Sequence, residues 1–174
     1  MDPSVFVTND LLIDIAGAKF VQRIWIDFIY LKNDPLENTA RYAGTKSGLV
    51  EALTQSLSKN IRVSQCLPVV ENHNEQYKLN GGMETYRYRL VDGHNRISAL
   101  KQLGYTGYWF DLAEFGCDGV SYETSKTDFA MASNAFIPKE ASNDLDYQTQ
   151  AVNLVLKNEI NGDLEGVRTW LKKY

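Results

Sequence analysis

The sequence predicts a mixed α/β (α+β) fold, with one compact sheet domain followed by a C-terminal helical extension. The chain has 174 residues, a length that suits one domain with an appendage. Strand-like and helix-like segments alternate between residues 20 and 124, and only helical patterns follow them. We therefore divide the chain into an N-terminal segment (1–19), a sheet domain (20–124) and a helical extension (125–174).

Composition and charge narrow the class of protein. Apolar residues make up 44% of the chain and charged residues 23%, which excludes a wholly disordered or fibrous protein. We expect no membrane partner and a cytoplasmic location, because no stretch approaches ~18 apolar residues and no secretion signal is visible. Cys66 and Cys117 are too few for a disulfide framework. The net charge of −4 gives no overall surplus of bases for duplex DNA.

The first half of the sheet domain shows two strands and a helix. Residues 20–31 are rich in β-branched and aromatic side chains and run into Asn33-Asp34-Pro35, which predicts a strand closed by a turn. Leucines at helical spacing predict a helix over Ser47–Lys59. Residues 66–70 predict a short strand. It is either an edge strand or begins at Pro68, because proline donates no ladder hydrogen bond.

The second half continues the alternation. Residues 71–85 read as a long hairpin connection that reverses at Gly81-Gly82, and residues 86–91 as a strand entering the core. A helix is expected over 95–103, closed by Gly104. The remaining elements are a strand at 108–112 and helices at 126–135, 145–159 and 163–174.

The most informative stretch is the junction at Asp92–Arg96, where a strand passes through a glycine turn into a helix. The backbone N–H groups and the positive dipole end of a helix start form an anion site. Gly93 tolerates a positive φ and lets a ligand approach the backbone. Arg96 can bind phosphate oxygens through its planar guanidinium. A cation at this end is unfavourable for the helix alone, as expected if an anion completes the site.

Two residues of the junction add acid–base chemistry. His94 can donate to phosphate, act as general acid or base, or bond to nearby carbonyls. Asp92 can orient His94, bind a metal or cap the helix. The alternative is an ordinary strand-to-helix turn with an Asp or Asn N-cap and a solvent-facing Arg96. Both interpretations stay open, and the grouping of Gly, His, Asn and Arg within five positions favours a site.

Three segments resemble signature boxes of the ParB/sulfiredoxin-like superfamily. LVDGHNRISALKQLGY (90–105) is similar to the second box, in which a strand, a glycine-basic loop and a helix bind nucleotide or another phosphate. IRVSQCLPVV (61–70) is similar to the first box, in which a glutamine precedes a proline-led strand. Ser133-Asn134, followed by Asp144-Leu145, resembles the third. The resemblance covers roughly residues 20–155 and implies the compact mixed-sheet domain of that superfamily.

The resemblance implies a site for a nucleoside triphosphate and Mg²⁺. The implied residues are Gly93, His94, Asn95 and Arg96 on phosphate, Gln65 and Pro68 as a wall, Arg41 from a loop, Asn134 on the metal, and His94 with Asp92 as catalytic candidates. Ser133 departs from the family's pattern, because chromosome-partitioning ParB proteins carry there a Glu implicated in hydrolysis. His94 stands where sulfiredoxin has its catalytic cysteine, which disfavours that activity.

We expect nucleotide or phosphate binding at Asp92–Arg96, with hydrolysis of a nucleotide or nucleic-acid phosphoester as the leading chemistry. A non-catalytic DNA- or protein-binding module of the ParB type is one alternative, and a nucleotide-dependent small-molecule kinase is another. The helices at 145–159 and 163–174 are amphipathic, so they are candidates for contacting a protein partner or a second copy of the chain in a homodimer.

Other polar and aromatic residues are expected to be structural. His73 reads as a solvated loop histidine, Cys66 as core packing and Cys117 as an exposed thiol. The aromatics Tyr105, Tyr108, Trp109 and Phe110 suit core positions better than base stacking. The acids Asp111, Glu114, Asp118 and Asp128 suit a solvated surface better than a metal site.

Overall fold

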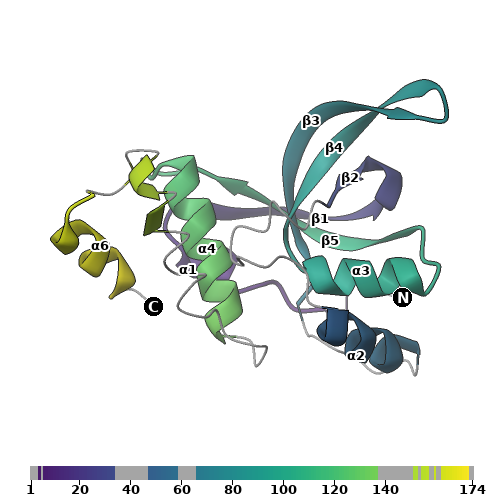
Figure 1. Cartoon of the computed structure of the whole chain (residues 1–174), viewed down its shortest axis with the longest axis horizontal. Coiled ribbons are helices and arrows are strands. Elements are labelled where there is room, and N and C mark those ends of the chain that lie inside the picture. The colour runs from purple at the N-terminus through teal and green to yellow at the C-terminus, as the bar shows by residue number, and fades with distance from the viewer. Residues whose placement is uncertain are drawn as a thin grey trace.

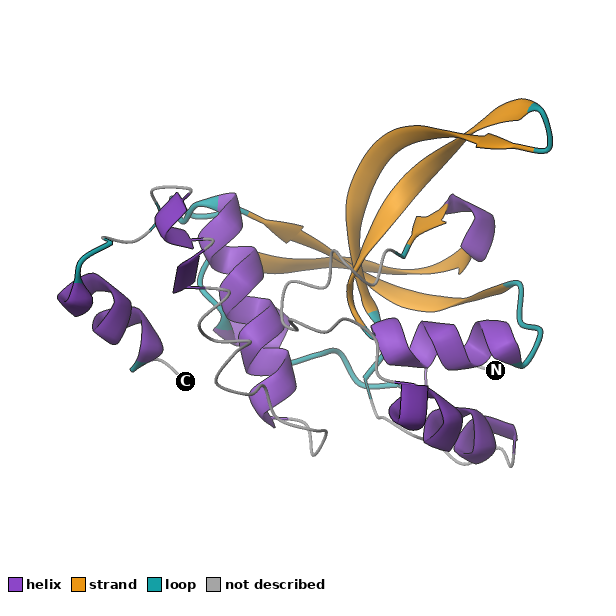
Figure 2. Cartoon of the chain, in the orientation of Figure 1, coloured by secondary structure: helices purple, strands orange, loops and turns teal. Residues whose placement is uncertain are grey.

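The computed structural model describes residues 4, 6–33, 47–58, 66–136, 151–152, 154–156, 159 and 162–172. Its elements are, in chain order, α1 (Leu11–Asp14), β1 (Ala18–Asp27), the 3₁₀ helix η2 (Phe28–Tyr30), β2 (Leu31–Lys32), α2 (Ser47–Ser58), β3 (Val69–Leu79), β4 (Gly82–Asp92), α3 (His94–Gln102), β5 (Gly107–Phe115), α4 (Tyr122–Phe136) and α6 (Leu164–Leu171). Figure 2 shows the strands gathered in one curved sheet with helices around it. The expectation of a mixed α/β fold is confirmed.

The sheet has five strands in the order β1-β5-β3-β4-β2. β1 pairs antiparallel with β5, and β3 pairs antiparallel with β4, whereas β5 with β3 and β2 with β4 are parallel. β3 is therefore a central strand that begins at Val69, directly after Pro68. The sequence predicted that the strand at Pro68 either begins at the proline or lies at the edge of the sheet. The first prediction is correct and the second is wrong.

The predicted strand over 20–31 is divided in two. After Asp27 the chain forms η2, where the Phe28 amide donates to the Thr106 carbonyl at 2.7 Å. β2 then joins the opposite edge of the sheet beside β4. The division is invisible in the sequence because the apolar pattern runs through it without a Gly or Pro.

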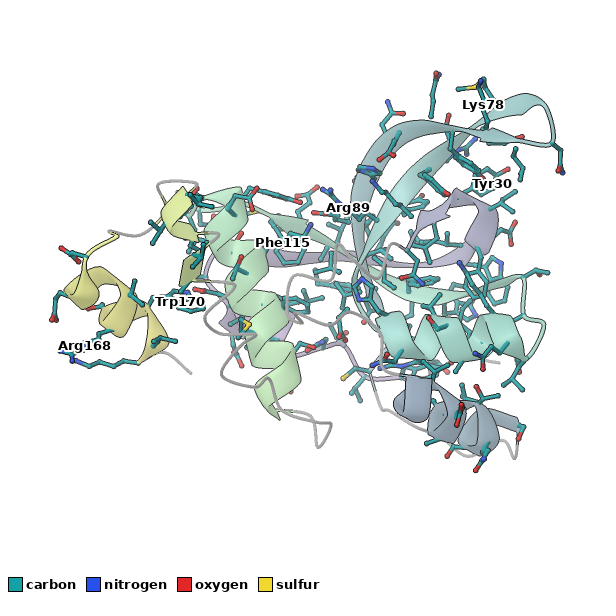
Figure 3. The ribbon with its side chains drawn as sticks, in the orientation of Figure 1. Tyr30, Lys78, Arg89, Phe115, Arg168 and Trp170 are labelled. Carbon is teal, nitrogen blue, oxygen red and sulfur yellow. The ribbon has the colours of Figure 1, made fainter. Side chains whose placement is uncertain are left out.

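The predicted hairpin connection at 71–85 is a projecting β-ribbon. β3 and β4 stay paired out to Leu79 and Gly82, and the reversal occurs at Asn80-Gly81, both of which have positive φ. Figure 1 shows this ribbon reaching away from the helices, and Figure 3 places Lys78 near its end. The polar sequence looked like a loop because the outer part of the ribbon buries little of either face.

Two apolar clusters cover the two faces of the sheet. On one face α3 contributes Ile97 and Leu100 to a core that is centred on Phe110 and Val70. On the other face α1 and α4 pack against Val69, Val91 and Ala113. The helices at 47–58 and 94–102 match the predicted positions, and Gly104 follows α3 with a φ of 82°.

Among the described residues, the C-terminal part holds three helical pieces. α4 begins at Tyr122, four residues before the predicted start. Residues 151–152 and 154–156 are helical, and residues 145–150 lie outside the described part of the chain. α6 begins after the N-cap Asp163, and its Trp170 packs with Met131 of α4. None of the helices in the described residues is long and apolar enough to cross a membrane.

Candidate functional site

The junction at Asp92–Arg96 has the predicted strand–glycine–helix geometry. β4 ends at Asp92, and Gly93 is the N-cap of α3 with a φ of 99° and a ψ of 18°. α3 therefore begins without a side-chain cap, since glycine has no acceptor to offer. The alternative interpretation, an Asp or Asn N-cap, is wrong.

Both the positive φ at position 93 and the close packing of Pro68 against it require a glycine there. A β-carbon at this position would lie 2.8 Å from Cβ of Pro68, closer than side-chain carbons approach one another. Pro68 ends the segment before β3, and Val69 pairs with Asp92 in the ladder. The two signature segments thus meet at this contact, and the close approach at Gly93 is made by the proline ring.

Gly93→Ala is expected to lower the free energy of unfolding by about 2–4 kcal/mol. It adds both a left-handed backbone penalty and a clash with Pro68. Gly104→Ala is the matched control, because its φ is 82° and nothing lies within 4 Å of the added carbon. It is expected to lose only about 1–2 kcal/mol. Urea denaturation measures both, and equal losses would show that Pro68 does not constrain Gly93.

Arg96 is buried in the first turn of α3. Only 6% of the residue is exposed, and its Nη1 donates to the Cys66 carbonyl at 2.7 Å. A solvent-facing Arg96 is therefore wrong. One carbonyl uses one of five guanidinium donors, so the group keeps capacity for an anion. Burial raises the pKa of the Cys66 thiol, and the positive charge of Arg96 offsets part of that rise.

Asp92 and His94 flank Gly93 and are both buried, whereas Asn95 is half-buried. The His94 carbonyl accepts a hydrogen bond from Ser98 Oγ within α3 at 2.9 Å. A buried carboxyl, an imidazole and a guanidinium thus lie within five consecutive residues at a helix start. This combination of side chains can bind an anion and supply a general acid or base.

The structure brings together only part of the predicted site. Asp92, Gly93, His94, Asn95, Arg96 and Pro68 lie at one place. Gln65 and Arg41 lie outside the described residues. Asn134 lies in the last turns of α4, and its side chain is outside the described part. Within the described residues, no three His, Cys, Asp or Glu side chains gather to hold a metal. Asp92 is the described carboxylate that could take part in binding Mg²⁺, with phosphate oxygens completing the shell.

Two solved structures resemble this chain in fold. One is a Pnob8-like ParB-N domain, which matches with a TM-score of 0.54 and 15% identity over 86% of this chain. The fold is ParB-like. The other is the C-terminally truncated chromosome-partitioning protein ParB from Caulobacter crescentus complexed with CTP-γ-S, with a TM-score of 0.47 and 15% identity over 81% of this chain. The chain spans 56% and 67% of those proteins, respectively. No protein-family model and no curated protein matches the sequence.

Several other predictions need correction within this ParB-like fold. His73 lies in β3 and not in a loop, and its Nε2 is 3.0 Å from Glu75 Oε2. Tyr105 is exposed, whereas Tyr108 and Phe110 are core residues as predicted. Cys66 and Cys117 are both half-buried. Asp111 is fully buried and bound by Arg23, so its assignment to a solvated surface is wrong.

A buried polar cluster between the sheet and α4 was not predicted. We call it the Glu71 cluster: Glu71 of β3, Arg89 of β4, and Tyr122 and Lys126 of α4. Glu71 Oε1 accepts hydrogen bonds from Lys126 Nζ at 2.6 Å, Arg89 Nε at 2.7 Å and the Tyr122 hydroxyl at 2.8 Å. Figure 3 labels Arg89 where the strands approach α4. The only sequence signal was the position of Glu71 directly after the buried Val69-Val70.

In the Glu71 cluster, Glu71 and Lys126 each stabilise the charged form of the other. Burial alone would raise the pKa of the Glu71 carboxyl, but the charge and hydrogen bond of Lys126, with Tyr122 and Arg89, hold it below its ordinary value. Burial lowers the pKa of the Lys126 ammonium, and Glu71 opposes that change. Burial and the hydrogen bond to Glu71 raise the pKa of the Tyr122 hydroxyl, so it stays a donor.

The Glu71 cluster predicts a pH-dependent loss of stability. Glu71 has a pKa below its ordinary 4.5 in the folded protein, so its contribution is present above that pH and is lost as the pH falls. Glu71→Gln is expected to lower the free energy of unfolding by about 2–3 kcal/mol at neutral pH. The difference from the wild type should shrink in acid. Urea titrations across this range measure it, and a constant difference would contradict the charged form of Glu71.

Proposed function

We propose that the protein binds a phosphate-bearing nucleotide at the start of α3 and hydrolyses it there. One observation carries the proposal: Arg96, a buried cation, lies in the first turn of a helix whose N-cap is glycine. Both the helix dipole and the buried charge favour an anion at this place. The resemblance of residues 90–105 to a phosphate-binding box and the ParB-like fold support the same site.

Each residue of the junction has a role in this proposal. Arg96 and the first amides of α3 bind phosphate oxygens, and Pro68 with Gly93 shapes the floor beside them. His94 accepts the proton of the attacking water, while the bond from the terminal phosphorus to the bridging oxygen breaks and inorganic phosphate leaves. Asp92 orients His94 or holds Mg²⁺ together with Asn134. In this proposal Gln65 forms a wall of the site together with Pro68, and Arg41 is the loop arginine near the ligand.

A thermal-shift screen with ATP, GTP, CTP and UTP, each with Mg²⁺, tests binding, since a ligand specific to the folded form raises the Tm. We expect at least one nucleotide to raise it. Released phosphate is then measured for that nucleotide, and His94→Ala should keep binding while losing release. If no nucleotide changes the Tm, the proposal is wrong.

The second candidate function is a non-catalytic module of the ParB type that holds nucleotide and engages DNA or a protein through its C-terminal helices. Ser133 favours it, because the carboxylate of the family's hydrolytic position is absent. Val152 and Leu156 also leave an apolar stripe exposed, at 57% and 75%, for a protein partner or a second copy of the chain. Bound but unchanged nucleotide supports this version. A phosphorylated acceptor, such as free serine, would indicate the kinase alternative.

A further inference from the structure

Two contacts join the three residues before β3 to the proposed anion site. The Cys66 carbonyl accepts a hydrogen bond from Arg96 Nη1 at 2.7 Å. Pro68 lies directly against Gly93, since a β-carbon added to that glycine would stand 2.8 Å from Cβ of Pro68. A hydrogen bond of this length tolerates little displacement of its acceptor. Whatever fixes the Cys66 carbonyl therefore also fixes where the guanidinium of Arg96 lies.

The same three residues are held from β5. The Asp111 amide donates to the Pro68 carbonyl at 3.0 Å, and Asp111 pairs with Val69 in the parallel ladder between β5 and β3. The side chain of Asp111 is fully buried, and its Oδ1 accepts from Arg23 Nε at 2.8 Å. Asp111 thus contacts Pro68 through its backbone and Arg23 through its carboxylate.

Arg23 connects this pair to the N-terminal segment. Its Nη1 donates to the Phe6 carbonyl at 2.8 Å and its Nη2 to the Val7 carbonyl at 3.4 Å. Val7 in turn forms a parallel β-bridge with Cys66. One planar guanidinium therefore binds a buried carboxylate and two successive carbonyls. The contacts close a ring that runs from Cys66 through Pro68, Asp111, Arg23 and Val7 back to Cys66.

We propose that Arg23 is a positioning residue of the anion site, which aligns Val7 beside Cys66 and so holds the carbonyl to which Arg96 is bonded. The inference rests on the proposed function, since its consequence is a change in anion affinity. Arg23 does not contact the ligand in this scheme. The N-terminal segment then supports the site through its backbone, and its Phe6 side chain lies in the same core as Val70.

Arg23→Lys separates position from stability. The ammonium keeps a positive charge beside Asp111, but one nitrogen cannot reproduce the planar fork that also reaches the Phe6 and Val7 carbonyls. Phe6 stays a core side chain, so the N-terminal segment remains docked and only its alignment changes. We expect the Tm to fall by less than about 5 °C. The affinity for inorganic tripolyphosphate with Mg²⁺, measured by calorimetry, should fall about fivefold.

Glu71→Gln is the matched control for a loss of stability. It disrupts another buried ion pair, in which Glu71 Oε1 and Lys126 Nζ are 2.6 Å apart, and it leaves every contact of the ring in place. It should lower the Tm at least as much as Arg23→Lys while the affinity stays within about twofold of the wild type. Equal losses of affinity in the two variants would indicate general destabilisation and overturn the inference.

Arg23→Met/Asp111→Asn is a second variant, which removes both charges of the pair, keeps the backbone amide at position 111, and should lose affinity about tenfold. A ligand-free readout accompanies both variants: the Nε–Hε resonance of Arg96 should move in them and stay fixed in Glu71→Gln. Wild-type affinity in both variants would overturn the inference. If the wild type itself binds no tripolyphosphate, the proposed function fails, and the Arg96 resonance alone then decides the positioning role.

Discussion

Arg96→Ala is expected to lower the affinity for a phosphate-bearing nucleotide by about 10- to 100-fold. A charge-assisted hydrogen bond from a buried guanidinium contributes about 1.5–3 kcal/mol, and no other described cation lies in the first turn of α3. The variant also leaves the Cys66 carbonyl without its donor, so a modest loss of stability accompanies the loss of binding. Isothermal titration calorimetry with the best nucleotide of the screen measures the affinity.

Two further variants serve as comparisons for Arg96→Ala. Lys101→Ala removes a cation from the last turn of the same helix and should leave the affinity within about twofold. Arg96→Lys keeps the charge but loses the planar fork of donors, so its affinity should fall between the other two. An Arg96→Ala protein that is folded, as judged by circular dichroism, and binds nucleotide like the wild type would exclude this site.

Arg23→Met is expected to lower the free energy of unfolding by about 3–5 kcal/mol, because it leaves a buried carboxylate without its cation. Asp111 is fully buried, and Arg23 binds it through Nε to Oδ1 at 2.8 Å and Nη2 to Oδ2 at 3.3 Å. Arg23 Nη1 also donates to the Phe6 carbonyl at 2.8 Å. The substitution therefore loosens the N-terminal segment as well as the β1–β5 pair.

Urea denaturation of Arg23→Met, with the m-value checked against the wild type, measures this loss. Lys19→Met is the control, because it removes an exposed cation from the same strand and should change stability by less than about 0.5 kcal/mol. Arg23→Met/Asp111→Asn should recover part of the loss, since no buried charge is then left alone. A loss below about 1 kcal/mol in Arg23→Met would mean that Asp111 is stabilised by other groups.

Much of the fold could be predicted because local signals coincide with tertiary structure. The junction at Asp92–Arg96 was visible since glycine, a strand pattern and a helical pattern meet there, and the structure places Gly93 at a positive φ. Pro68 likewise marks the start of β3. These residues act through their own backbone preferences, which a single sequence reveals.

The missed features depend on partners far apart in the chain. Glu71 and Lys126 are 55 positions apart, and Arg23 and Asp111 are 88 apart, so neither ion pair is visible as a local pattern in the sequence. The β3–β4 ribbon was missed for the opposite reason. Its outer half projects from the rest of the sheet and buries few side chains. Its residues are therefore mostly polar, and they lack the alternation of apolar and polar side chains that would predict two strands.

The most direct measurement is a titration of the ¹⁵N-labelled protein with inorganic tripolyphosphate, followed through its backbone amide resonances. The account predicts that the resonances of His94, Asn95 and Arg96 move first and saturate together, and that they stay still in Arg96→Ala. Saturable shifts centred elsewhere in the chain, with these three amides unmoved, would contradict an anion site at the start of α3.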